Sequence, residues 1–110
     1  MKTKRDISIE EAASAFAALG SEQRLQVLQV LVRAGPDGLS MGDIGERSGI
    51  TGSTLNHHLR FLTTAGLVEQ EKRGRSVICT SVAYDMAEAL SAFILENCCA
   101  DTDKKEHSHG

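Results

Sequence analysis

The sequence contains few of the residues that mark several common classes of protein. Its 110 residues include no tryptophan, one tyrosine, one proline and three cysteines. An odd number of cysteines argues against a framework of disulfide bonds. No run approaches the roughly 18 apolar residues of a membrane-spanning helix, and the segment 1–11 has no apolar run typical of a secretion signal. We therefore expect a cytoplasmic protein with no membrane partner, in which thiols stay reduced.

An excess of positive charge is also missing, because the formal net charge is −3. Net charge hides how charge is distributed, however. The stretch from Arg60 to Arg75 gathers four basic residues against two acidic ones. Apolar residues make up 41% of the chain, which is typical of a globular protein of one domain. A locally basic surface on such a domain is compatible with DNA as a partner.

Helix start and stop signals divide the first third of the chain. Ser8 followed by Glu11 forms an S-x-x-E capping box, and Gly20 is a typical helix stop. Ser21 precedes a second apolar pattern at helical spacing, which the glycine- and proline-containing segment AGPDGLS ends. These signals predict two helices, over residues 9–19 and 22–33.

The middle of the chain has the pattern of two short helices joined by a tight turn. Ser40 and Thr51 stand where helices are expected to start, and Gly49 and Gly66 stand where they are expected to stop. A turn of about three residues that includes glycine is typical of a helix-turn-helix motif. The predicted helices span residues 41–48 and 52–65.

A β-hairpin is predicted directly after this motif. Two β-prone runs are joined by a charged turn that contains Gly74. A helix-turn-helix followed by such a hairpin is a winged helix, so we expect a mainly α fold with one β-hairpin. The predicted strands span residues 67–70 and 76–81.

The last predicted helix runs from Tyr84 to about Cys98 and carries a broad apolar surface. One small domain does not easily cover such a surface, so we expect a homodimer formed through the terminal helices. We predict a winged-helix DNA-binding and dimerisation domain over residues 1–99 and a flexible polar tail over residues 100–110. The apolar residues of this helix include Met86, Leu90, Phe93 and Ile94.

Helical geometry sorts the residues of the helix predicted over 52–65 onto two sides. At about 100° per residue, Leu59 and Leu62 fall within about 40° of Leu55, which marks the side toward the core. Polar side chains gather on the opposite side, as in a helix that contacts base edges in the major groove. We predict DNA contacts for Ser53, Thr54, Asn56, His57 and Arg60.

The residues around this polar face have two interpretations. His58 lies about 60° from Leu55, beside the core, so a structural role is favoured over a base contact. Arg73 and Arg75 flank Gly74 at the tip of the hairpin. We predict that both arginines contact the DNA backbone or the minor groove, and the alternative is that they only keep an exposed turn soluble.

These segments resemble the ArsR (ArsR/SmtB) family of bacterial winged-helix repressors. ALGSEQRLQVLQVLV resembles the second helix of the family, and TLNHHLRFLTTAGLVEQEKRGRSVIC resembles its recognition helix and wing. The resemblance covers about residues 16–95 and implies a homodimeric repressor, not an enzyme. Such a repressor leaves double-stranded operator DNA when a metal, metalloid or other signal binds. Asn56 stands where the family often has serine, which changes the operator sequence to be expected.

The positions of the cysteines indicate which effector the protein binds. The segment SMGDIGERSG lacks the cysteine pair of the family's best-known arsenic site, and YDMAEALSAFILEN lacks the histidines of its zinc site. Cys98 and Cys99 resemble the sensing cysteines of an arsenic-responsive subgroup, which implies trivalent arsenic, as arsenite or methylarsenite, as the effector ligand. Two thiolates suit methylarsenite, whereas arsenite favours three sulfurs. Cys79 is either a possible third ligand or a small buried strand residue.

Two other hypotheses remain open. A thiol-redox or persulfide-sensing repressor of the same fold needs cysteines that bridge, and adjacent cysteines bridge poorly. A small thiol enzyme or metal-handling protein needs a positioned base or an anion-binding loop beside its cysteine. Near Cys98, the only histidines are His107 and His109. We interpret them as part of the polar tail, with zinc or copper binding as the alternative.

Overall fold

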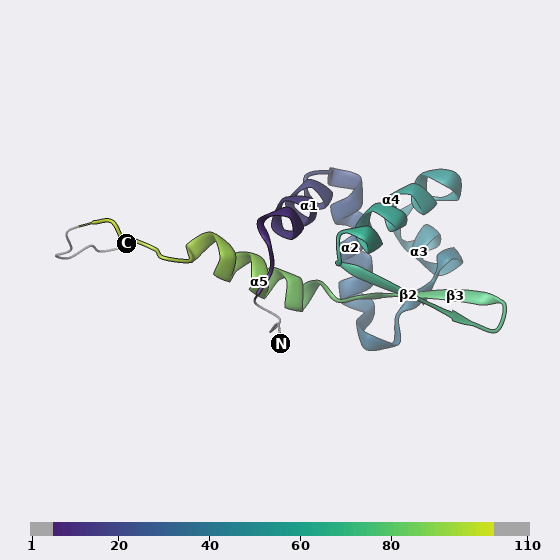
Figure 1. The fold of residues 1–110 in the computed structure, drawn as a ribbon. Coiled ribbons are helices and arrows are strands. Elements are labelled where there is room, and N and C mark those ends of the chain that lie inside the picture. Colours follow the sequence, from purple (N-terminus) through teal and green to yellow (C-terminus); the bar gives the residue numbers. More distant parts are fainter. Residues whose placement is uncertain (1–5, 103–110) are drawn as a thin grey trace.

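The computed structural model describes residues 6–102, and Figure 1 shows how their elements are arranged. A long β-hairpin projects from one end of the molecule, while the last helix extends toward the other end. The helices are α1 (Ile9–Leu19), α2 (Glu22–Ala34), α3 (Met41–Ser48), α4 (Gly52–Thr64) and α5 (Ala83–Leu95). The strands are β1 (Leu39–Ser40), β2 (Val68–Arg73) and β3 (Ser76–Ser81), and a 3₁₀ turn covers Gly35–Asp37.

Side-chain caps fix the starts of the first helices where the sequence predicts them. The Ser8 hydroxyl accepts a hydrogen bond from the Glu11 backbone N–H at 3.0 Å, and the Glu11 carboxylate accepts one from the Ser8 N–H at 2.8 Å. This reciprocal capping box starts α1. The Ser21 hydroxyl starts α2 in a similar way by accepting from the Arg24 N–H. A cap of this kind stabilises a helix by about 1 kcal/mol.

The turn between α3 and α4 sets the helix-turn-helix geometry. Gly49 ends α3 in the left-handed conformation, with φ of 78°, which glycine adopts without steric cost. The Ser48 hydroxyl then accepts a hydrogen bond from the Ile50 N–H at 3.0 Å, and Ile50 is buried. The chain therefore turns within a few residues, and the predicted helix-turn-helix is confirmed.

The hairpin is antiparallel and longer than the sequence indicates. β2 pairs with β3 from Val68 opposite Ser81 to Arg73 opposite Ser76, so β2 continues three residues beyond its predicted end at Gln70. Pairing with β3 holds the charged residues at the end of β2 in the ladder despite their low β-propensity. β1, which the sequence analysis did not predict, joins the other side of β3.

The core lies where α2, α4 and the sheet meet. Its fully buried side chains include Val27 and Leu31 from α2, Leu59 and Leu62 from α4, and Cys79 from β3. A second, smaller cluster packs α1 against α5. It contains Ala12, Ala15 and Leu90.

α5 covers only part of its apolar surface within one chain. Ile94 and Leu95 at its end are each 59% exposed, and Ile9 at the start of α1 is 67% exposed. Between residues 6 and 102, no helix has the length and apolar character that crossing a bilayer requires. Most of the predicted tail, with His107 and His109, lies outside the described residues.

Candidate nucleic-acid interface and thiol pair

One side of α4 presents polar side chains to solvent. Leu55, Leu59 and Leu62 are buried, which confirms the side that faces the core. The five residues that the sequence analysis assigned to DNA contact lie on the remaining surface and are all exposed. They are Ser53, Thr54, Asn56, His57 and Arg60. The structure therefore brings these five side chains together on one exposed helix.

The start of α4 differs in one respect from the prediction. Thr51 occupies the N-cap position, but its side chain makes no capping hydrogen bond with the described residues. Gly52, the next residue, has φ of 66°. The first-turn N–H groups of α4 are thus not capped by this hydroxyl, and they add partial positive charge at the end of the helix that carries Ser53 and Thr54.

His58 points into the protein, as the sequence indicates. It is 7% exposed, and its Nε2 lies 3.0 Å from Oε1 of Gln23 on α2. Among the described residues, its buried Nδ1 has no hydrogen-bond partner. Burial lowers the pKa of His58, and the nearby charge of Arg24 and the neighbouring His57 lower it further. The predicted position of His58 beside the core is confirmed, although only one of its two ring nitrogens has a partner among residues 6–102.

The hairpin tip carries the two predicted arginines. Gly74 and Arg75 form its two-residue turn, in which Gly74 has φ of 63°, as the first position of a type II′ turn requires. Both Arg73 and Arg75 are exposed. Nη2 of Arg73 lies 3.1 Å from the carboxylate of Glu71, two residues earlier on β2. The two arginines therefore differ in effective charge, because the Glu71 carboxylate partly neutralises Arg73.

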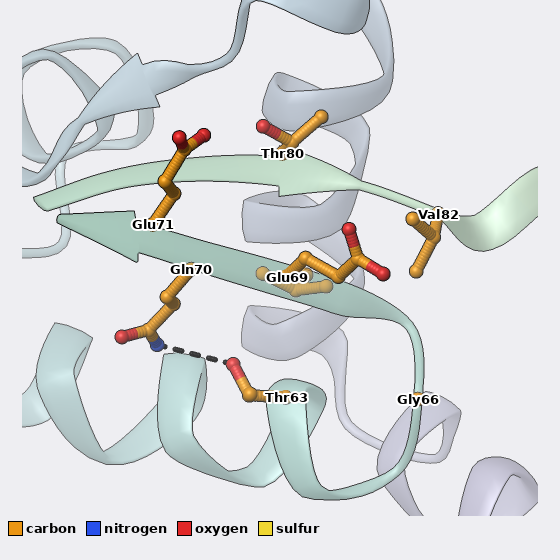
Figure 2. A pocket seen from close by; sticks show the side chains of 8 residues that line it. Thr63, Gly66, Glu69, Gln70, Glu71, Thr80 and Val82 are labelled. Carbon is orange, nitrogen blue, oxygen red and sulfur yellow. Dashed lines mark hydrogen bonds between the residues drawn. The ribbon is translucent and has the colours of Figure 1, made fainter. Parts of the chain in front are cut away.

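A hollow of 610 Å³ lies beside β2, between the hairpin and the end of α4 (Figure 2). Its lining includes Glu69 and Glu71, and the Gln70 amide donates a hydrogen bond to the Thr63 hydroxyl at 3.0 Å across it. Two carboxylates make this hollow unsuitable for a phosphate group. Within residues 6–102, no group of three or more His, Cys, Asp and Glu side chains gathers closely enough to hold a metal ion.

Three residues at α4 were not predicted from the sequence: Gln23 and Arg24, which contact α4, and Phe61, which belongs to it. The guanidinium carbon of Arg24 lies 4.0 Å from the centre of the Phe61 ring. Phe61, His57, Arg60 and Thr64 line a shallow hollow of 210 Å³. A signal was present, because Phe61 lies about 120° from Leu55 on the helical wheel, outside the apolar side.

The thiol pair lies after α5 and not within it. The helix ends at Leu95, three residues before the predicted end at Cys98. Asn97 and Cys99 then have positive φ angles of 59° and 64°, which breaks the helical arrangement of neighbouring side chains. As a result, the sulfurs of Cys98 and Cys99 converge to 3.5 Å. The hydrogen bond with Cys98, partial burial and the neighbouring thiol raise the pKa of Cys99.

Cys79 does not share this environment. It is 0% exposed in the middle of β3, opposite Leu39 of β1 and Gln70 of β2. Burial raises the pKa of its thiol. The interpretation of Cys79 as a small buried strand residue is confirmed, and in the described part of the chain it forms no three-ligand cluster with the pair.

Comparisons with known proteins agree with this architecture. A family model described as a helix-turn-helix domain matches residues 19–71. The HTH-type transcriptional regulator NmtR of Mycobacterium tuberculosis is 34% identical over 84 residues, which cover 76% of this chain and 68% of that protein. An ArsR-like transcriptional regulator from Rhodococcus sp. RHA1 has a TM-score of 0.67 at 30% identity, covering 84% of this chain and 82% of that chain.

A more distant structure shares the fold alone. It is the homodimeric winged helix-turn-helix DNA-binding domain Mb0332 from Mycobacterium bovis, with a TM-score of 0.64 at 20% identity over 89% of this chain and 90% of that chain. The chain spans between 62% and 68% of the length of the curated relatives it matches.

The fold, the exposed polar helix and these similarities define a DNA-binding transcriptional regulator of the winged helix-turn-helix class. The chain belongs to the ArsR family. Members of this family are regulators and not enzymes, in agreement with the expectation from the sequence.

Proposed function

We propose that the protein is a homodimeric repressor that leaves its operator when trivalent arsenic, as arsenite or methylarsenite, binds Cys98 and Cys99. It would act in the cytoplasm, on double-stranded DNA. The observation that carries the proposal is the 3.5 Å separation of the two sulfurs outside the helix. The assignment of residues 1–99 to the DNA-binding and dimerisation domain is part of the same proposal.

The exposed side of α4 supports the DNA-binding part. Short polar side chains and one arginine suit base edges in the major groove, and Asn56 suits adenine. We assign base contacts to Ser53, Thr54, Asn56 and His57, and a phosphate or guanine contact to Arg60. On the wing, we assign Arg73 and Arg75 to phosphates or the minor groove.

The geometry of the thiol pair supports a soft centre held by two sulfurs. Sulfurs 3.5 Å apart subtend an angle of about 100° at an atom bonded to both at about 2.3 Å, the length of a typical metal–thiolate bond. Thiolates prefer soft centres. Because Cys79 is buried in the sheet, a ligand that needs two sulfurs fits better than one that needs three. This favours methylarsenite over arsenite.

Two further observations support a dimer as the working form. Apolar side chains at the start of α1 and the end of α5 remain exposed in one chain, among them Ile9 and Ile94. The Mycobacterium bovis domain of the same fold is a homodimer. In a dimer formed through α1 and α5, the thiol pairs would lie at the ends of the interface helices, where ligand binding could change the spacing of the two recognition helices.

The test is release of operator DNA, selected with the protein from a random duplex pool, during titration with arsenite and methylarsenite. Fluorescence anisotropy should show release of the untreated protein, with methylarsenite acting at lower concentration. The double variant Cys98→Ser, Cys99→Ser should bind DNA normally and no longer respond. Cys79→Ala is the matched control and should respond like the unmodified chain. A double variant that is still released would contradict the proposal.

The same experiment separates the redox alternative. Treatment with a polysulfide followed by mass spectrometry would show whether Cys79 becomes linked to Cys98 or Cys99. Release of DNA that requires such a link, and that arsenicals do not cause, would replace the metalloid proposal with a thiol-redox or persulfide sensor. The structure gives this alternative no particular support, because the buried Cys79 and the exposed Cys98 lie in different environments.

A further inference from the structure

Arg24, in the first turn of α2, contacts the end of α1. Its Nε donates a hydrogen bond to the Ala18 carbonyl at 2.8 Å, and its Nη2 donates to the Ala17 carbonyl at 3.2 Å. The last turn of α1 has no basic residue of its own. The guanidinium therefore supplies the cation that the carbonyl end of a helix favours, and two bonds in a planar fork fix its orientation.

The face of the same guanidinium stacks on Phe61, a residue of the proposed recognition helix α4. Its central carbon lies 4.0 Å from the centre of the Phe61 ring, a cation–π geometry. Phe61 in turn meets the His57 ring edge-on, with ring centres 6.2 Å apart and planes at 77°. The Arg24 guanidinium thus connects the end of α1 to the Phe61 ring, and Phe61 connects it to His57 on the exposed polar side of α4.

The neighbouring residue makes a second connection between the same two helices. Oε1 of Gln23 lies 3.0 Å from Nε2 of the buried His58. Gln23 and Arg24 are consecutive on α2, while His58 and Phe61 are one turn apart on α4. Two attachments on adjacent turns restrict rotation of α4 about its axis as well as its distance from α2. We call these four residues the clamp.

We propose that the clamp, and Arg24 in particular, positions the recognition helix for sequence-specific DNA binding. Arg24 acts through Phe61 on the orientation of His57 and of α4, without itself contacting bases. A rotation of α4 would displace all the side chains assigned to base contact together. Sequence-specific binding should therefore depend strongly on the orientation of α4, whereas non-specific attraction to phosphates should depend on it little. The inference is independent of which effector the protein binds.

The experiment compares specific with non-specific binding in Arg24→Lys and Phe61→Leu. Lysine keeps the charge but loses the planar fork and the stacking face, and leucine keeps an apolar side chain but loses the ring. Each variant should bind the selected duplex roughly tenfold more weakly, with unchanged affinity for an unrelated duplex of equal length. The double variant should lose little more than either single one, because both remove the same contact. Arg33→Lys, an exposed change in the last turn of α2, is the matched control.

Two additional readouts identify competing roles for Arg24. If Arg24 only contacted a phosphate, Arg24→Gln would weaken both duplexes in parallel and lower the salt slope by about 0.9. If it only stabilised the fold, thermal unfolding would shift while both affinities, measured where all variants are folded, stayed at the values of the unmodified protein. Either outcome overturns the proposal.

A spectroscopic measurement tests the contact between Phe61 and His57, on which the proposed orientation depends. The ring protons of His57, observed by NMR, should shift in Arg24→Lys and in Phe61→Leu and stay in place in Arg33→Lys, because the Phe61 ring lies edge-on to His57. Unchanged His57 signals in both clamp variants would also overturn the proposal. If Arg24→Lys fails to fold, the test uses Phe61→Leu alone, since Phe61 is already 38% exposed and its replacement leaves the core unchanged.

Discussion

The buried His58 on α4 makes the stability of the fold depend on pH. Its ring is buried, one nitrogen faces Gln23, and the other has no partner among residues 6–102. Protonation would add a second N–H donor to a buried site and a positive charge near Arg24. Burial and the charge of Arg24 accordingly lower the pKa of His58 below its ordinary value of about 6.5.

This lowered pKa predicts a loss of stability in mild acid. Below about pH 6.5 the unfolded chain binds a proton at His58 that the folded chain does not, so the free energy of unfolding falls as pH decreases toward the folded-state pKa. The upper limit of this slope, for one proton, is about 1.4 kcal/mol per pH unit. Urea unfolding between about pH 7.5 and 5.5 should show this loss, and His58→Gln should flatten it. The exposed His57→Gln should retain it, and equal slopes in all three proteins would contradict the assignment.

Individual residues were predictable from sequence where one helical wheel decided their environment. The position of His58 beside Leu55 indicated a buried histidine, and the five residues of α4 that were assigned to DNA contact are all exposed, as expected. The conformations of Asn97 and Cys99 were not predictable in this way. Positive φ angles are uncommon for residues other than glycine, and no glycine marks the turn that brings Cys98 and Cys99 together.

At the scale of elements, boundaries were predictable where a local signal sets them. The capping box starts α1, and Gly49 ends α3, at the expected residues. Local signals in the sequence are weaker for strands, because pairing with a neighbouring strand decides where a strand ends. β2 continues to Arg73 only because β3 lies opposite, and the two-residue strand β1 exists only through its pairing with β3. The helical wheel placed Phe61 outside the apolar side of α4, but no local pattern indicated that Arg24 would be its partner.

The wing as an element yields a prediction about charge. Arg73 lies 3.1 Å from the Glu71 carboxylate, whereas Arg75 has no ion pair with another described residue. If the wing contacts phosphates, Arg75→Ala should weaken DNA binding and reduce the slope of log affinity against log salt concentration by about 0.9. Glu71→Gln should do the opposite and strengthen binding roughly twofold to threefold, because it frees Arg73 and removes a repelling charge.

Anisotropy titrations over a range of salt concentrations measure both effects. Glu22→Gln, which removes an equal charge from the first turn of α2, is the control for net charge. An affinity that rises as much in Glu22→Gln as in Glu71→Gln would assign the gain to overall charge and not to the wing.

At the scale of the whole molecule, the two proposed sites lie at opposite ends of one chain. Figure 1 shows the hairpin projecting at one end and α5 extending toward the other, and Cys98 and Cys99 follow the end of α5. α1 packs on α5 through Ala12, Ala15 and Leu90, and α1 is joined to α4 through Arg24. In the proposed dimer, the layer formed by α1 and α5 would therefore connect both the thiol pair and α4 to the partner chain.

The exposed apolar side chains of this layer predict that DNA binding requires a dimer. Ile9 and Ile94 are 67% and 59% exposed in one chain, and a charge at either position would have to be buried in an interface. Ile9→Glu and Ile94→Glu should each shift the protein to a monomer in analytical ultracentrifugation and weaken operator binding by roughly 100-fold, because two linked recognition helices are replaced by one. The folded chain should persist by circular dichroism, since neither side chain belongs to the core. Leu25→Glu, at a 41% exposed position on α2, should remain dimeric. A monomeric variant that binds the operator with full affinity would show that one recognition helix suffices.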